Sequence, residues 1–308
     1  MFAGRTVSCL LLALVIAVPA VAAEPADVVG DRGTTNAVKL PGGTDQGAQA
    51  TAVSSQAPPA DDPDLDIDPL QTDFTLVTMP TTLRMPRWKS GFRVTHRFTR
   101  SLGQGSFGSL AEDFFGIDAG AAIGLEYRLS LLRGSHVGFR RTNDRTIEFS
   151  AQYILLLQER ESKLVGLSAI ASVDGTNNFR DSYTPALGVV VSRSLPGVGT
   201  VYAMPVWVNN SNPNPSEVVD DNDAFLLGLG TRLRIRPSVY LVGEIIPRVA
   251  GYDPGVNQAT FGVEKLLGLH VFQLSVSNGF GTTMGQVARG GFSSDDWYLG
   301  FSIARKFF

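Results

Sequence analysis

The sequence has almost no cysteine: among its 308 residues there is one, Cys9, near the N-terminus. Cys9 lies inside an apolar run, and the residues before it, Thr6 to Ser8, do not form a lipobox, so we do not expect acylation. Without Cys9 the chain has no thiol, which excludes disulfides, cysteine nucleophiles and thiolate metal sites. The fold must therefore be held by packing and hydrogen bonds alone.

Long hydrophobic runs are also scarce. One run, residues 9–23 (CLLLALVIAVPAVAA), follows Arg5 and ends in the small residues Val21-Ala22-Ala23. It is too short to span a bilayer as a helix, and its end fits the small-x-small pattern of a cleavage site. We interpret residues 1–23 as a signal peptide with a mature start at Glu24; the alternative is a retained membrane anchor. After residue 23 no apolar run reaches the roughly eighteen residues that a spanning helix needs.

Residues 24–75 contain few large apolar residues and are rich in Pro, Gly, Ala, Thr, Gln and Asp. They carry ten acidic residues against only Arg32 and Lys39. Such a segment cannot bury enough apolar area to offset its ordering entropy, so we predict a disordered acidic linker. The remaining domain, residues 76–308, is slightly basic, because 23 basic and 19 acidic residues lie from residue 74 onward.

From residue 91 onward apolar and polar residues alternate with a period of two, which indicates strands. In residues 123–130 (IGLEYRLS) one face is apolar and the other carries Glu126 and Arg128. A membrane protein without spanning helices must satisfy its backbone between strands, which requires a closed barrel. The alternation therefore predicts an all-β, closed antiparallel up-and-down transmembrane β-barrel with a lipid-facing apolar side and a polar interior.

About twelve segments show this alternation: 92–99, 122–130, 135–141, 146–158, 163–173, 183–193, 200–208, 224–235, 239–247, 259–266, 270–278 and 297–307. Most odd-numbered connections are long and polar, and every even one is short. Outer-membrane barrels of Gram-negative-type bacteria show this difference between external loops and periplasmic turns. We therefore expect the linker in the periplasm and the strand at 92–99 paired with that at 297–307. Pro185 and Pro205 predict local interruptions of the ladder.

The polar phase of the strands contains ten charged residues. On the lipid face an Arg or Lys would cost about 2–4 kcal/mol at the midplane, so the phase places these residues in the lumen. Two interpretations remain open: a mutually paired network that fills the lumen, or a charged constriction that selects solutes. The candidates are Arg93, Arg97, Glu126, Arg128, Arg140, Glu148, Arg232, Arg234, Glu244 and Glu264.

Two motifs suggest ligands but lack their context. Residues 103–108 (GQGSFG) fit the dinucleotide pattern GxGxxG, but no helical pattern of a βαβ unit follows. Residues 64–68 (DLDID) have calcium-loop spacing, but Pro69 and Thr75 stand where a glycine and a bidentate acid are needed. We interpret them as a glycine-rich external loop and a solvated charge run.

The histidines, His96, His136 and His270, lie on three distant strands, and no Ser/His/acid spacing stands out. We therefore predict no catalytic, metal or cofactor-binding residue, and no cofactor. The connection 100–121 contains residues 110–115 (LAEDFF), which are apolar for an exposed tip. It either folds as a short helix into the barrel as a plug or packs on the rim.

Seven stretches, in this order, also resemble one family of proteins: 92–98 (FRVTHRF), 114–121 (FFGIDAGA), 240–248 (YLVGEIIPR), 251–255 (GYDPG), 261–265 (FGVEK), 270–274 (HVFQL) and 297–301 (WYLGF). Between about residue 80 and residue 308 the chain resembles the bacterial β-barrel family called domain of unknown function 5777. The resemblance implies a barrel and supplies no activity or ligand residue.

The sequence thus favours a non-enzymatic outer-membrane barrel that acts as a narrow pore for small polar solutes. The alternative is a closed structural barrel that binds a partner through its linker or external loops. An intramembrane hydrolase ranks last for want of a triad. Expected partners are outer-membrane lipid and, during assembly, the outer-membrane insertion machinery, which commonly reads a terminal aromatic such as Phe308. No nucleic-acid partner is expected.

Overall fold

The computed structural model describes residues 65, 68–158, 164–212, 222–253, 255–291 and 293–308. The chain divides into two units, residues 1–56 and 57–308, and every described residue belongs to the second. The predicted signal peptide and the predicted linker up to residue 64 lie outside the described residues. Residues 68–75, which we assigned to the same linker, are described.

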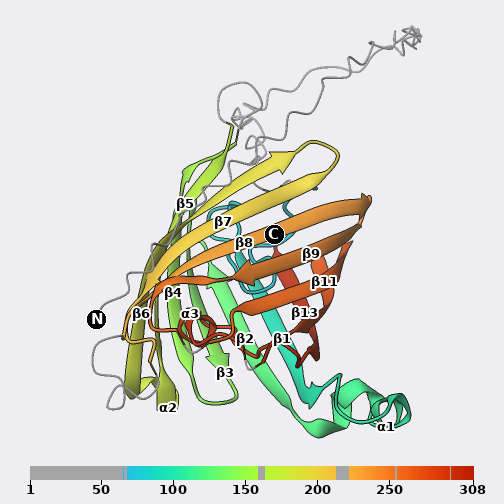
Figure 1. Cartoon of the computed structure of the whole chain (residues 1–308). Coiled ribbons are helices and arrows are strands. Elements are labelled where there is room, and N and C mark those ends of the chain that lie inside the picture. The colour runs from blue at the N-terminus through green and yellow to red at the C-terminus, as the bar shows by residue number, and fades with distance from the viewer. Residues whose placement is uncertain (1–64, 66–67, 159–163, 213–221, 254, 292) are drawn as a thin grey trace, which may run out of the picture. The chain divides into compact units, whose positions relative to one another are not determined.

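Strands make up most of the second unit (Figure 1). They are β1 (Ser90–Ser101), β2 (Ala121–Leu129), β3 (Ser135–Thr142), β4 (Ile147–Leu156), β5 (Gly166–Gly175), β6 (Asp181–Leu195), β7 (Gly199–Val208), β8 (Ala224–Arg236), β9 (Val239–Ile246), β10 (Arg248–Gly251), β11 (Gln258–Leu267), β12 (His270–Ser277) and β13 (Tyr298–Phe307). Consecutive strands are hydrogen-bonded and antiparallel around the sheet.

The sheet closes on itself, because β1 pairs with β2 on one side and with β13 on the other. Arg97, for example, lies opposite Ala122 of β2 and Gly300 of β13. The short β10 continues β9 beyond Pro247, since both strands pair with β8. Counted as one, they make a closed barrel of twelve antiparallel strands, which confirms the predicted fold and its closure.

The prediction that proline interrupts the ladder holds at one of the two positions. The pairing of β6 with β7 has a gap opposite Pro205, between the pairs Gly188–Val206 and Val191–Ala203. Proline has no N–H to donate, which accounts for the gap. Pro185 instead stays within the ladder between β5 and β6, opposite Val173.

Short helices lie at the end of the barrel that carries the long loops: α1 (Phe107–Glu112), the 3₁₀ helix η2 (Phe114–Ala119), α2 (Thr176–Phe179) and α3 (Met284–Ala288). Among the described residues no helix is long and apolar enough to cross a membrane. We call this end the loop end, and the opposite end, with the short turns, the turn end. Figure 1 shows α1 beyond the ends of β1 and β2.

The interpretation of the 100–121 loop as a plug is wrong. A short helix does form there, but Phe107 and Phe114 are 76% and 67% exposed. Arg100 holds this loop through an ion pair with Asp113 and a hydrogen bond to the carbonyl of Ser109 (3.0 Å). Local ion pairing therefore keeps the loop outside the lumen.

A different segment fills the barrel. Residues 71–86, which we call the plug segment, are mostly buried and touch inward-facing side chains of β1, β2, β4, β6, β8, β9, β11 and β12. The segment folds into a hairpin: Leu76 donates to the carbonyl of Met79 (2.8 Å) and Thr81 to that of Phe74 (2.9 Å). The linker predicted to reach residue 75 therefore extends too far, because residues 71–75 are packed inside the barrel.

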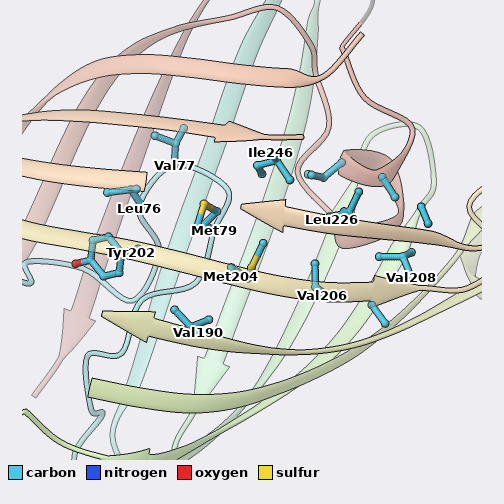
Figure 2. Close-up of a cluster of buried hydrophobic side chains, with 14 of the residues drawn as sticks. Leu76, Val77, Met79, Val190, Tyr202, Met204, Val206, Val208, Leu226 and Ile246 are labelled. Carbon is cyan, nitrogen blue, oxygen red and sulfur yellow. The ribbon is translucent and has the colours of Figure 1, made fainter. Parts of the chain in front are cut away.

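The apolar core lies inside the barrel, on one side only. It consists of inward residues of β6 to β9, three plug residues and two residues of α3 (Figure 2). In a barrel with a water-filled lumen these inward positions would be polar. The cluster is Leu76, Val77, Met79, Ala186, Val190, Tyr202, Met204, Val206, Val208, Ala224, Leu226, Val242, Ile246, Val287 and Ala288.

Candidate functional site: the plugged lumen

The structure places nine of the ten charged candidates on the inner side of the wall and one at the mouth. Eight of the nine are buried, and the side chain of Arg140 is 11% exposed. Arg234 differs, because it lies at the turn end, lines the hollow there and donates to the carbonyl of Pro237 (3.1 Å). The alternation in the sequence therefore predicted on which side of the wall each charged residue lies. It could not distinguish the middle of the lumen from its rim.

The first group of wall charges binds the part of the plug segment that precedes its hairpin turn. Arg93 of β1 forms an ion pair with Asp73 (Nη1 to Oδ2, 2.6 Å) and donates to the side chain of Gln273 (3.2 Å). Arg128 of β2 donates to the hydroxyl of Thr75 (2.8 Å). Charge-assisted hydrogen bonds of this kind are stronger than neutral ones, so they fix the depth of the plug.

Glu244 of β9 binds the tip of the plug. Its carboxylate accepts backbone N–H groups from Val77 (3.2 Å), Thr78 (2.9 Å) and Met79 (3.1 Å), and also the hydroxyl of Thr78. Successive N–H groups that converge in this way form a nest for an anion. The wall carboxylate therefore satisfies donors that the tight turn would otherwise leave without partners.

A fully buried ion pair of the wall also contacts the plug segment. Arg232 of β8 and Glu264 of β11 lie 3.0 Å apart (Nη2 to Oε2) with neither side chain exposed. Arg232 also donates to the carbonyl of Thr75 (3.2 Å), and Glu264 accepts the hydroxyl of Thr72. The strands on either side of β9 are thus connected through the plug.

A second cluster of charges binds the connection between β12 and β13, residues 278–297, which we call the α3 loop. Arg140 bridges Glu126 (2.6 Å) and Glu148 (3.0 Å) and also donates to the carbonyl of Thr282. Glu148 accepts the backbone N–H of Met284 (2.8 Å). We predicted a long external loop here. Its helix α3 instead turns into the lumen, where Val287 and Ala288 are buried.

Buried charges of both signs meet in the described lumen, and Asp73 of the plug is one of the anions. Six cations and six anions lie along it, and the Arg248 side chain, 1% exposed, is a further cation at the loop end. This arrangement resembles the first of our two interpretations, a mutually paired network that fills the lumen. The plug segment and the α3 loop also take part in it. The twelve are Arg93, Arg97, Arg128, Arg140, Arg232, Lys306, Asp73, Glu126, Glu148, Asp174, Glu244 and Glu264.

Hollows remain in the middle of the described lumen and at both of its mouths. One of about 50 Å³ lies between the plug tip and the α3 loop and is lined by Thr78, His136 and Met284. A second of about 450 Å³ opens at the turn end beside Gln71, and a third of about 430 Å³ opens at the loop end beside Gln286. The central hollow holds only a few water molecules. The plug segment and the α3 loop thus lie across the lumen between the two mouths.

The remaining motifs stay apart from this site. Residues 103–106 lead into α1, which begins at Phe107, and Asp64 and Asp66 of the DxDxD run lie outside the described residues. His96 and His270 stack on the aromatic rings of Phe301 and Phe272, whereas His136 faces the lumen. Within the described ranges no three His, Cys, Asp or Glu side chains are grouped so that they could hold a metal ion.

Sequence reasoning missed the apolar half of the lumen, the plug segment and the α3 loop. Strand β7, residues 199–208 (GTVYAMPVWV), carried a signal for the first, because it is apolar in both phases. A lipid-facing strand that is also apolar inside requires something apolar to cover its inner face. The plug and the α3 loop gave no comparable local signal.

Comparison with solved structures finds barrels that share little sequence with this chain. The KdgM porin, solved in complex with disordered oligogalacturonate, is 8% identical with a TM-score of 0.43, covering 71% of this chain and 99% of that one. Outer membrane phospholipase A from Escherichia coli is 11% identical (TM-score 0.43; 78% and 98% covered). Omp33 from Acinetobacter baumannii is 9% identical (TM-score 0.40; 74% and 100% covered).

No curated protein sequence matches the chain. Residues 72–307 match the family described as "Membrane bound beta barrel domain (DUF5777)", a span that begins inside the plug segment and ends with β13. This chain belongs to that family, and its described unit is a membrane-bound β-barrel.

Proposed function

We propose that this chain is a non-enzymatic passage through the outer membrane, closed at rest by its own plug segment. One observation supports this most: charged wall residues bind the plug, and Glu244 alone accepts three of its backbone N–H groups. An element held by a few polar contacts in a preformed barrel is suited to two states, seated and released.

The barrel does not need the plug for its own ladder. Strand β1 begins at Ser90, after the plug, and the isolated bridge Thr75–Pro80 joins plug residues only to each other. Released plug residues would therefore leave all twelve strands paired. Residues 87–89 connect the plug to β1 at the turn end, so the plug would leave toward that end.

The lengths of the connections support the orientation that we propose. Long loops at one end and short turns at the other match the external and periplasmic ends of outer-membrane barrels. The plug would then be released into the periplasm, where the N-terminal linker is also expected. Lipid of the outer membrane and, during assembly, the insertion machinery remain the proposed partners.

The test is the conductance of the full chain in a planar bilayer. Glu244→Gln removes the charge that binds the plug tip, and we expect it to raise the open probability about tenfold over a largely closed wild type. The matched control is Thr260→Ala, a buried wall residue whose hydroxyl bonds only Ser277 (2.9 Å). This control should behave as wild type does.

A disulfide lock tests the same idea in the opposite direction. The hydroxyls of Thr82 and Ser192 are in contact, so Thr82→Cys with Ser192→Cys places two sulfurs within bonding reach. The oxidised protein should stay closed even with Glu244→Gln, and a reductant should restore its openings.

If the Glu244→Gln protein shows no conductance although protease cuts its plug, the proposal is overturned. The rival, a closed structural barrel that binds a partner through its linker or external loops, then holds; the apolar cluster around Leu76 favours it.

A further inference from the structure

The lumen has two chemically different walls, a feature that a pore for small polar solutes does not need. Inward residues of β6 to β9 are largely apolar, for example Val190, Met204 and Leu226. Inward residues of β13 and β1 to β3 include the cations Lys306, Arg93, Arg97, Arg128 and Arg140. The described residues of these strands carry one inward anion, Glu126, so this wall has a net positive charge. A solute that contacts both walls must be apolar at one end and anionic at the other.

The plug segment already has this character. Its Asp73 carboxylate lies on Arg93, and Leu76 and Met79, a few residues later, pack among the apolar side chains of β7 to β9. Figure 2 shows Leu76, Val77 and Met79 beside Tyr202, Met204 and Ile246. The plug thus occupies the lumen as an anion joined to an apolar body.

The cationic wall also has donors to spare. Lys306 Nζ, Arg93 Nε and Arg97 Nη2 are buried and have no hydrogen-bond partner within the part of the chain that the structure describes. Beside Asp73 a small cavity of about 20 Å³ is lined by the cations Arg93, Arg128 and Lys306 and by one further acid, Glu126, which pairs with Arg128. Buried donors without partners are costly, and an incoming anion would satisfy them.

We propose that the open lumen binds an anionic amphiphile, with its head at Arg93 and Lys306 and its alkyl part on the β6–β9 wall. The proposal rests on release of the plug, as argued above. Release leaves the apolar wall in water and the cations without Asp73. A ligand shifts such an equilibrium only through its different affinity for the two states, and this ligand compensates both losses. A small polar solute compensates neither.

The probe for plug release is a single cysteine, Leu76→Cys. Leu76 is fully buried, and the mature chain has no other thiol if residues 1–23 are removed. In lipid nanodiscs a water-soluble maleimide should label Cys only when the plug leaves the lumen. Octyl sulfate should speed labelling about tenfold. Methyl sulfate lacks the tail, octyl glucoside lacks the charge and octyltrimethylammonium has the opposite charge, so none of them should do so.

The matched variants are Lys306→Met and Lys265→Met. Among the described residues the Lys306 ammonium donates no hydrogen bond to the plug, and it lies 6.0 Å from the ring centroid of Phe74. Lys265 is exposed at the same end. Lys306→Met should abolish the response to octyl sulfate, and Lys265→Met should keep it. Equal acceleration by octyl sulfate and octyl glucoside, or a full response in Lys306→Met, overturns the proposal. Labelling that stays absent even with Glu244→Gln instead overturns plug release itself.

Discussion

The two walls of the lumen hold the same plug by different physics. The polar wall contacts it through a few directed bonds, such as Arg93 to Asp73 and Arg128 to the hydroxyl of Thr75. The apolar wall contacts it through the side chains of Leu76 and Met79, with no direction beyond shape. Directed bonds set the position of the plug, because a shift of an ångström breaks them. Apolar burial sets how strongly the plug is retained, because it scales with area.

The difference implies that the two walls fail differently. A lost charge on the polar wall leaves its partner buried without compensation, which is costly at a single site. A trimmed side chain on the apolar wall leaves a cavity, whose cost is smaller and depends on how far the neighbours relax. The plug therefore has one wall that is sensitive to chemistry and one that is sensitive to volume.

The largest effect is expected from Arg232→Ala. Arg232 is a charge that β8 carries among the apolar residues of its wall, and its loss leaves Glu264 buried without its cation. We expect the barrel to lose about 3–5 kcal/mol of unfolding free energy, measured by urea titration in a fixed lipid mixture. The control is Arg234→Ala, two residues along the same strand but at the mouth, where the cost should stay below about 0.5 kcal/mol. Similar losses for the two variants would show that burial does not separate them.

These two arginines also show what the sequence could and could not predict. The alternation in β8 placed both on the inner side of the wall, and the same alternation predicted twelve strands and the pairing of β1 with β13. A period of two does not encode the position of a residue along the barrel axis. The position of Arg234 at the rim could therefore not be predicted.

The plug segment could not be predicted for a related reason. Its contacts are remote: Val77 meets Glu244, 167 residues away. Its composition, with Thr and Pro around a few apolar residues, resembles that of the acidic stretch before it. Only the apolar inner phase of β7 showed that the lumen holds something, and it did not show what.

On the apolar wall, Met204→Ala should cost about 2–5 kcal/mol, because Met204 is fully buried beneath the plug. The loss of stability should appear first as faster maleimide labelling of Leu76→Cys, because the cavity forms at the surface that retains the plug. Leu229→Ala on the lipid side of β8 is the control, with a 44% exposed side chain, and should label at the wild-type rate. Equal rates in the two variants would contradict a retaining role for this wall.

Gly230→Ala tests the same wall by adding volume. A Cβ at this position would lie 2.5 Å from Cδ2 of Leu76, so the buried side chain of Leu76 must shift. Overpacking of this kind costs about 1–3 kcal/mol, and here it should weaken seating of the plug more than pairing of the strands. Leu76→Ala in the same chain removes the clash and should restore resistance of the plug to protease. A double variant no better than Gly230→Ala would place the strain in the wall itself.

The smallest effect is expected at an ion pair outside the lumen whose N–O distance is similar to that of Arg232 and Glu264. Arg248 and Asp253 lie 3.1 Å apart at the loop end, close to the 3.0 Å of Arg232 and Glu264, but the Asp253 side chain is 63% exposed. The backbone N–H of Gly255, and after it Arg248, lowers the pKa of Asp253 below its usual value. A lowered pKa stabilises the fold above the unfolded value, near pH 4, and this stabilisation is lost as the pH falls through the folded value. Asp253→Asn should therefore cost about 0.5 kcal/mol or less at pH 7, and the difference from wild type should vanish once the pH is below the folded pKa. Urea titrations of both proteins across that range measure it. A cost at pH 7 that approaches that of Arg232→Ala would show that pair length, and not burial in the lumen, sets the hierarchy.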